Sequence, residues 1–163
     1  LQLDMIWPDP AMLVEAKAHF SHSVEIILQV GEKALDMISL DPDNELPTPE
    51  ELIEMLKEYE DTVDRFLLDL SMGHGKEMDA HILLPYVEAI MTHLPNKGIV
   101  VAGGLGPDTL NLIGPICQVC PRVSIDAQSK LHVGNNARFA LDMHKVKNYL
   151  AKSIMVFSSA SSL

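Results

Sequence analysis

The sequence predicts an α/β fold built on a parallel sheet. Short apolar segments of strand type alternate with amphipathic helical segments along the chain, and this alternation is typical of βα units. The apolar segments are almost continuous, which indicates strands that are buried on both faces. A length of 163 residues, with 47% apolar and 21% charged residues, fits one globular domain. We expect this domain to span residues 1–157 and to be followed by a frayed tail at residues 158–163.

Five apolar segments are predicted to form the strands. Each is rich in Val, Ile, Leu or Phe, the residue types that favour a pleated and buried backbone. A polar or glycine-containing segment follows each one, as expected where a strand ends. The predicted strands are residues 1–5, 25–30, 65–70, 98–102 and 123–127.

The helix starts are marked by caps and prolines. Thr48 is a good cap residue, Pro49 suits the first helical position, and Glu51 completes a capping box. We therefore predict a helix from Pro49 to about Tyr59. Further helices are predicted after Pro10, Glu32, Pro85, Pro107 and Leu141, the last one reaching about Phe157.

The alternation of strands and helices implies parallel strands that are joined by right-handed crossovers. Both a doubly wound sheet and a barrel satisfy this pattern. A complete barrel of eight units takes roughly 200–250 residues, or about 25–31 residues for each unit. The chain therefore has room for five βα units and not for eight.

The charge balance restricts the partners that the chain can bind. Twelve basic and 23 acidic residues give a net charge of −11, which disfavours nucleic acids and anionic membranes because both are negatively charged. The chain has no apolar segment of membrane-spanning length, and its first residues lack the basic region of a signal peptide. We expect a cytoplasmic protein with no nucleic-acid partner and no membrane partner.

Metal binding is not predicted. Cys117 and Cys120 have C-x-x-C spacing, but a zinc site would need two further ligands, so we interpret them as ordinary cysteines. Asp4, Asp69 and Asp126 would hold Mg²⁺ only if their strands converge, which the sequence alone does not show.

Polar residues follow the predicted strands at their carboxyl ends, the edge at which parallel α/β folds bind ligands. Asp69 ends the third apolar run and precedes a loop with two glycines. An acidic side chain there suits general acid or base catalysis, and the alternative is an aspartate that only caps nearby amides. The other candidates at this edge are Gln2, Asp4, Asp126 and the loop residues Gly73, His74 and Gly75.

A glycine-rich segment after the fourth strand predicts a phosphate site. Gly103, Gly104 and Leu105 lie between that strand and a helix predicted to open at Pro107. Glycine amides near a helix N-terminus bind phosphate without a basic side chain, and the alternative is a tight turn that requires positive φ. Ser129 and Lys130, after the fifth strand, would complete the site.

In their order and spacing, these strand-end motifs resemble the C-terminal part of the phosphoribosylanthranilate isomerase family, which acts in tryptophan biosynthesis. The resemblance covers about residues 1–150. It implies a parallel (β/α) barrel of the TIM-barrel, ribulose-phosphate-binding type, of which the fourth to eighth units are present as a partial barrel. The motifs are Leu1-Gln2-Leu3 for the fourth strand, residues 25–30 for the fifth, Leu67-Leu68-Asp69 for the sixth, Ala102-Gly103-Gly104-Leu105 for the seventh and Ile125-Asp126 for the eighth, with Asp79 before the sixth helix.

The resemblance implies an activity, the isomerisation of an aminoaldose phosphate to an aminoketose by acid–base catalysis. Asp69 matches the family's general acid, and the phosphate would bind near Gly103, Gly104 and Ser129. The implied partner is a phosphorylated small molecule, and neither a metal nor an organic cofactor is implied.

The chain also departs from the pattern of that family. The family's general base is a Cys on the first strand, a place that neither Cys117 nor Cys120 occupies, and the first three strands have no counterpart. A ribulose-phosphate-3-epimerase-like enzyme and a non-catalytic phosphate-binding barrel fragment therefore remain alternatives, although the epimerase would have an acid in place of Ala102. Five strands cannot close such a barrel, so either the natural chain is longer or a second copy pairs with it.

Overall fold

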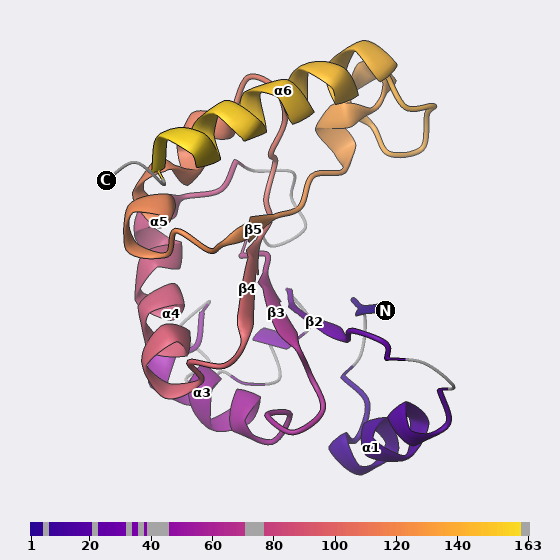
Figure 1. Ribbon diagram of the computed structural model, residues 1–163, viewed down its shortest axis with the longest axis vertical. Helices are drawn as coiled ribbons and strands as arrows, with labels where there is room; N and C mark the ends of the chain where they lie inside the picture. Colours follow the sequence, from indigo (N-terminus) through magenta and orange to yellow (C-terminus); the bar gives the residue numbers. More distant parts are fainter. Residues whose placement is uncertain are drawn as a thin grey trace.

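The computed structural model describes residues 1–4, 7–20, 23–31, 34–35, 38, 46–70 and 77–160 (Figure 1). Its centre is a sheet of five parallel strands in the order β1-β2-β3-β4-β5. Every predicted strand is present, and each is shorter than its apolar run because the ends of the run leave the hydrogen-bonded ladder. The strands are β1 (Gln2–Leu3), β2 (Ile27–Val30), β3 (Arg65–Leu68), β4 (Gly98–Val101) and β5 (Ser124–Ile125).

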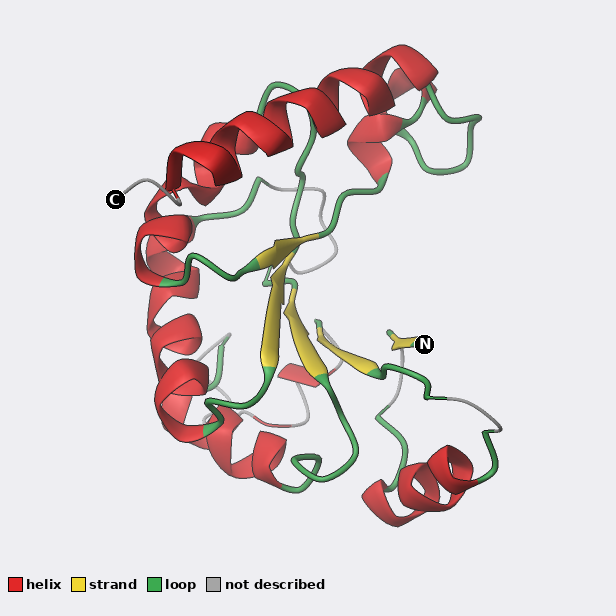
Figure 2. Ribbon diagram, in the orientation of Figure 1, coloured by secondary structure: helices red, strands yellow, loops and turns green. Residues whose placement is uncertain are grey.

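Helices alternate with these strands, and α3, α4 and α5 follow one another along one side of the sheet (Figure 2). The strand order has no reversal, whereas a doubly wound sheet reverses its order at a switch point. The architecture is thus an α/β fold consistent with a partial α/β barrel. The helices are α1 (Pro10–Ala18), α3 (Pro49–Lys57), α4 (Ala80–His93), α5 (Gly114–Val119) and α6 (Met143–Ala160), with 3-10 turns η1 (Leu110–Ile113), η2 (Ser129–Leu131) and η3 (Val133–Asn135).

The predicted capping box at the start of α3 is confirmed. The hydroxyl of Thr48 accepts a hydrogen bond from the amide of Glu51 at 3.2 Å, and the Glu51 carboxylate accepts one from the amide of Thr48 at 2.7 Å. Helices are also confirmed after Pro10 and Leu141, and residues 34, 35 and 38 are helical after Glu32. Helix α6 continues past Phe157 to Ala160, so the predicted frayed tail is helical over residues 158–160.

Two helix starts that were predicted from prolines are wrong. Helix α4 begins at Ala80, because the side chain of Asp79 caps the amide of His81 at 2.9 Å, and Pro85 lies inside the helix. There it forfeits a single backbone hydrogen bond. No helix opens at Pro107 either; the next helical residue is Leu110, in the 3-10 turn η1.

The register of the sheet sorts alternate residues onto two faces. Leu28, Phe66 and Ile99 lie side by side on the helix face, and all three are buried under the helical layer. The opposite face carries a smaller apolar cluster of Leu67, Val100 and Ala102 with Ile27. No helix in the described part of the chain is both long and apolar enough to cross a membrane.

Asp64 ties the amino ends of three strands together. Its carboxylate accepts hydrogen bonds from the amide of Ile26 at 2.7 Å and from Lys17 Nζ at 3.2 Å, and its carbonyl accepts one from the amide of Gly98 at 2.9 Å. Partial burial alone would raise the pKa of Asp64. The hydrogen bond from Ile26 and the Lys17 ammonium outweigh this effect and lower that pKa overall.

Asp64→Asn is expected to lower the free energy of unfolding at neutral pH by about 1–2 kcal/mol, because it removes charge-assisted bonds at a half-exposed site. The folded-state pKa lies below the unfolded value of about 3.9, so this stabilisation is present above pH 4 or so and is lost as the pH falls through the folded-state pKa. Urea unfolding of the wild type and of Asp64→Asn at about pH 7 and about pH 3 measures this difference in the free energy of unfolding. The exposed Asp61 is the matched control. A difference between Asp64→Asn and wild type that stays constant with pH would contradict the assignment.

Candidate functional site

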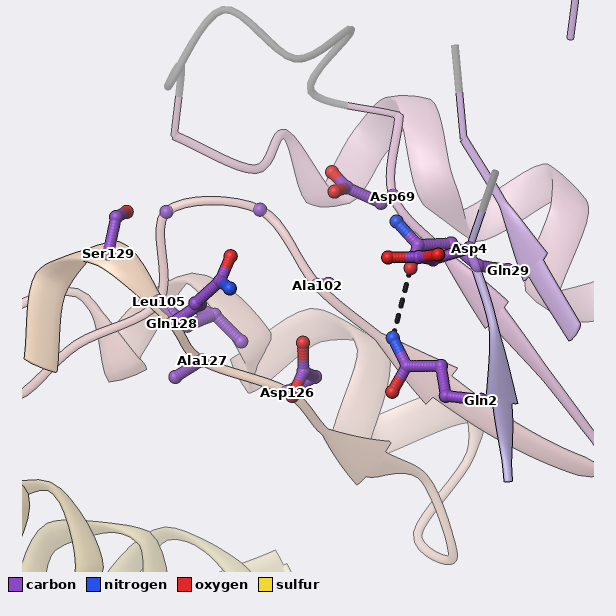
Figure 3. A pocket seen from close by; sticks show the side chains of 12 residues that line it. Gln2, Asp4, Gln29, Asp69, Ala102, Leu105, Asp126, Ala127, Gln128 and Ser129 are labelled. Carbon is purple, nitrogen blue, oxygen red and sulfur yellow. Dashed lines mark hydrogen bonds between the residues drawn. The ribbon is translucent and has the colours of Figure 1, made fainter. Parts of the chain in front are cut away.

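A cavity of about 480 Å³ opens at the carboxyl ends of the strands (Figure 3). All five strand ends contribute to it, as expected when parallel strands present their carboxyl ends at one edge of a sheet. Its lining residues are Gln2, Asp4, Gln29, Asp69, Ala102, Gly103, Gly104, Leu105, Asp126, Ala127, Gln128 and Ser129.

Most of the predicted site residues line this one cavity. The structure brings together Gln2, Asp4, Asp69, Gly103, Gly104, Leu105, Asp126 and Ser129. Lys130 is not among the lining residues, and Gly73, His74 and Gly75 lie outside the described residues. The predicted site set lacked Gln29, Ala102, Ala127 and Gln128. The signal for Gln29 is its place at the carboxyl end of a predicted strand, where it accepts a hydrogen bond from Gln2 Nε2 at 3.0 Å.

Asp69 and Asp126 occupy equivalent positions at the strand ends. Each continues the parallel ladder by one residue beyond its strand, and so does Ala102 between them. Ala102, between them in this row, contributes only a methyl group, and the carboxyl groups of both aspartates line the cavity (Figure 3). The hydrogen bonds run from the Asp69 amide to the Val30 carbonyl at 3.0 Å, from Ala102 to Leu68 at 2.9 Å and from Asp126 to Val101 at 3.0 Å.

The surroundings of Asp126 shift its pKa. Burial raises the pKa of Asp126, the negative charge of Asp69 raises it further, and a hydrogen bond from the amide of Ala127 offsets part of the rise. Asp126 thus holds a proton to a higher pH than an ordinary aspartate. Tyr149, on α6, lies near Asp126: burial, with a smaller contribution from the charge of Asp126, raises the pKa of Tyr149 to about 12. No sequence pattern singles out Tyr149, since its proximity to Asp126 arises from the packing of α6.

The glycine segment forms the second functional part of the cavity. Gly103 has φ +122° and Gly104 has φ +57°, values at which a side chain brings strain, most of all at Gly103. The carbonyl of Gly103 accepts a hydrogen bond from the amide of Met78 at 3.1 Å, and that of Gly104 accepts one from the Thr109 hydroxyl at 2.9 Å. These bonds hold both peptide groups in place.

The amides of the same segment have a different environment. Within the described ranges, no residue accepts a hydrogen bond from the backbone N–H groups of Gly103, Gly104 or Leu105, although all three residues line the cavity. Backbone N–H groups are strong donors that need an acceptor. Successive donors in a loop with positive φ suit an anion. The predicted contribution of a helix N-terminus is absent, because the turn closed by Thr109 delays helical structure to Leu110.

Lys130 braces this segment from outside the cavity. Its Nζ lies 2.6 Å from the Glu77 carboxylate. Its stem packs against Gly106, where an added Cβ would come within 2.7 Å of Lys130 Cβ. The predicted role of Lys130 as a phosphate ligand has no support in this geometry, since its charge is paired with Glu77.

The cysteines and carboxylates do not form a metal site in the described residues. Cys117 and Cys120 are buried in and next to α5, away from the cavity residues. Burial raises the pKa of both thiols, which opposes their use as a nucleophile or base.

Comparison of the chain with models of known protein families and with curated protein sequences finds no match. What this cavity can do therefore has to be inferred from its own geometry. It is lined by three residues whose amides suit an anion, and by two carboxyl groups, of which Asp126 has a raised pKa.

Proposed function

We propose that the chain binds a phosphorylated sugar in this cavity, with the phosphate on the amides of residues 103–105. The observation that carries the proposal is that three successive residues lining the cavity have backbone N–H groups without an acceptor in the described part of the chain. Such donors bind phosphate without a cationic side chain, which reconciles a phosphate ligand with a net charge of −11. The resemblance to the phosphoribosylanthranilate isomerase family supports the same ligand class.

The proposed reaction is the isomerisation of an aminoaldose phosphate to an aminoketose. It requires a proton for the ring oxygen as the ring opens, and later the removal of a proton from the neighbouring carbon. Asp69 is the proposed general acid, as the resemblance implies. Asp126 supports acid–base chemistry at the same place, because it lines the same cavity and its raised pKa lets it exchange a proton closer to neutral pH than an ordinary aspartate.

One observation favours a second candidate, an epimerase that acts on a ribulose phosphate. Asp69 and Asp126 line the same cavity from strand ends on either side of Ala102, and two carboxyl groups placed in this way could exchange protons at a single carbon. The two candidates share the phosphate site and differ in their product. Incubation with phosphoribosylanthranilate and, separately, with ribulose 5-phosphate distinguishes them. Binding of either compound without turnover supports the third alternative, a non-catalytic phosphate-binding barrel fragment.

Phosphate binding itself is tested by Gly104→Glu. We expect calorimetric titration of the wild type with inorganic phosphate and with ribulose 5-phosphate to show saturable binding. The variant should bind about 100-fold more weakly or not at all, because a carboxylate and its bulk enter the anion site.

The matched control is Gly104→Asn, since asparagine tolerates φ near +57° and its uncharged side chain leaves the backbone N–H of residue 104 available to the phosphate. It should bind within about fivefold of the wild type. No binding by a folded wild type, or equal affinities of the wild type and Gly104→Glu, would overturn the proposed phosphate site.

A further inference from the structure

A second cavity, of about 580 Å³, lies at the opposite, amino-terminal ends of the strands. Two of the chain's three arginines, Arg65 and Arg122, line it together with Lys97. No acidic residue is among its lining residues. The chain as a whole has 23 acidic and 12 basic residues, so a cavity lined by positive charges has the opposite sign to the net charge of the chain.

Arg65 is held at this cavity by the packing of the sheet. Its stem crosses Gly98 on the neighbouring strand, where an added Cβ would lie 2.6 Å from Arg65 Cγ. Its Nε donates to the Glu25 carboxylate at 2.8 Å, and its Nη1 lies 3.4 Å from the Ser124 hydroxyl. These partners use two of the five N–H donors of the guanidinium, so the others are available to a ligand.

The other two cations make fewer hydrogen bonds with the protein than Arg65 does. Lys97 Nζ donates one hydrogen bond, to the carbonyl of Val63 at 2.9 Å, and its charge contributes to the lowered pKa of Asp64. The guanidinium of Arg122 makes no hydrogen bond or ion pair with any residue in the described ranges. Glu25 compensates part of the charge of Arg65, whereas Arg122 has no such partner in the described ranges, so a bound anion would supply a counter-charge there.

We propose that this cavity is a second anion-binding site, which takes a small molecule with several negatively charged oxygens, carried by phosphate or carboxylate groups. Guanidinium groups bind such oxyanions through paired hydrogen bonds, and an ammonium beside them adds a point charge. The site is independent of the proposed sugar-phosphate cavity, because the two share no lining residue and lie at opposite edges of the sheet.

The test is a titration of the full chain with pyrophosphate and, separately, with citrate, followed through the arginine Nε–H NMR signals and by calorimetry. We expect the signals of Arg65 and Arg122 to shift and that of Arg138, which does not line the cavity, to stay in place. Arg122→Gln should weaken binding by about tenfold or more, because it removes charge-assisted hydrogen bonds. Arg138→Gln, which removes the same charge elsewhere, should bind within about twofold of the wild type.

The ligand that binds more tightly identifies phosphate or carboxylate as the preferred group, and either preference supports the site. Gly104→Glu should leave the shifts of Arg65 and Arg122 unchanged, so failure of the proposed sugar-phosphate site does not affect the result. Equal weakening by Arg122→Gln and Arg138→Gln would show attraction to net charge alone and would overturn the proposal. The proposal would also be overturned if Arg122→Gln bound the ligands normally but had a lower Tm. The cations would then serve only to stabilise nearby helix C-termini.

Discussion

Asp69→Asn is expected to lower kcat/KM for the isomerisation of phosphoribosylanthranilate by about 10²–10⁴-fold, the usual contribution of a general acid. An asparagine keeps the shape of the side chain but cannot deliver a proton to the ring oxygen. Phosphate affinity should remain close to that of the wild type, because the amides of residues 103–105 are unchanged. Asp4→Asn is the matched control: Asp4 is an exposed carboxylate that lines the same cavity, and its loss should change the rate far less.

The same variant has a consequence that does not depend on turnover. Burial and the charge of Asp69 both raise the pKa of Asp126, so removal of that charge should lower it while burial keeps part of the shift. Carboxyl ¹³C NMR titrations of the wild type and Asp69→Asn measure the change, with apparent pKa values that belong to the coupled pair in the wild type. An unchanged pKa of Asp126 would contradict the pairing of the two carboxyl groups, and an equal loss of rate in Asp4→Asn would contradict the role of Asp69.

Strands β3 and β4 were predictable because burial on both faces leaves an unambiguous pattern. Residues 66–68 and 99–102 are apolar without alternation, and both runs lie in or directly after central strands of the observed sheet. The capping box at Thr48 was predictable for a different reason: its two hydrogen bonds join residues three apart, so the sequence contains both partners. A capping box within four residues and a continuous apolar run can both be recognised without knowledge of the tertiary structure.

Proline was a poorer guide to helix starts, because the residue is compatible with several local structures. Pro49 does open a helix, but Pro85 lies inside α4 and Pro107 lies in a turn. What decides each case is a neighbouring side chain: Asp79 caps α4 before Pro85, and Thr109 closes the turn around Pro107. These side-chain bonds outweigh the preference of proline for the first helical position.

The candidate site was predictable as far as topology alone defines it. Parallel strands bring their carboxyl ends together, so residues such as Gln2, Asp69 and Asp126 converge although they are far apart in the chain. The pairing of Lys130 with Glu77 depends on side-chain packing between distant segments and could not be predicted. The same holds for the amino-terminal cavity, whose cations come from three separate segments.

Phe66→Ala is expected to lower the free energy of unfolding by about 3–5 kcal/mol, the usual cost of deleting a buried phenyl ring. Phe66 lies on central strand β3, is fully buried, and sits between Leu28 and Ile99 on the helix face. Because Phe66 lies in the core between the sheet and the helical layer, with Leu28 and Ile99 beside it, the cavity left by the ring cannot collapse easily. Urea unfolding measures the loss, and the m-value should stay close to that of the wild type.

Ile154→Ala is the matched control, because Ile154 lies on α6 and is 68% exposed. It should change the free energy of unfolding by no more than about 0.5 kcal/mol. Leu67→Ala adds a sharper comparison, since Leu67 follows Phe66 directly but belongs to the small cluster on the opposite face. We expect it to cost less than Phe66→Ala, because only Val100, Ala102 and Ile27 surround it in that cluster. If Leu67→Ala costs more, the opposite face would hold the principal core, and the helix face could not be the side of the sheet that stabilises the fold.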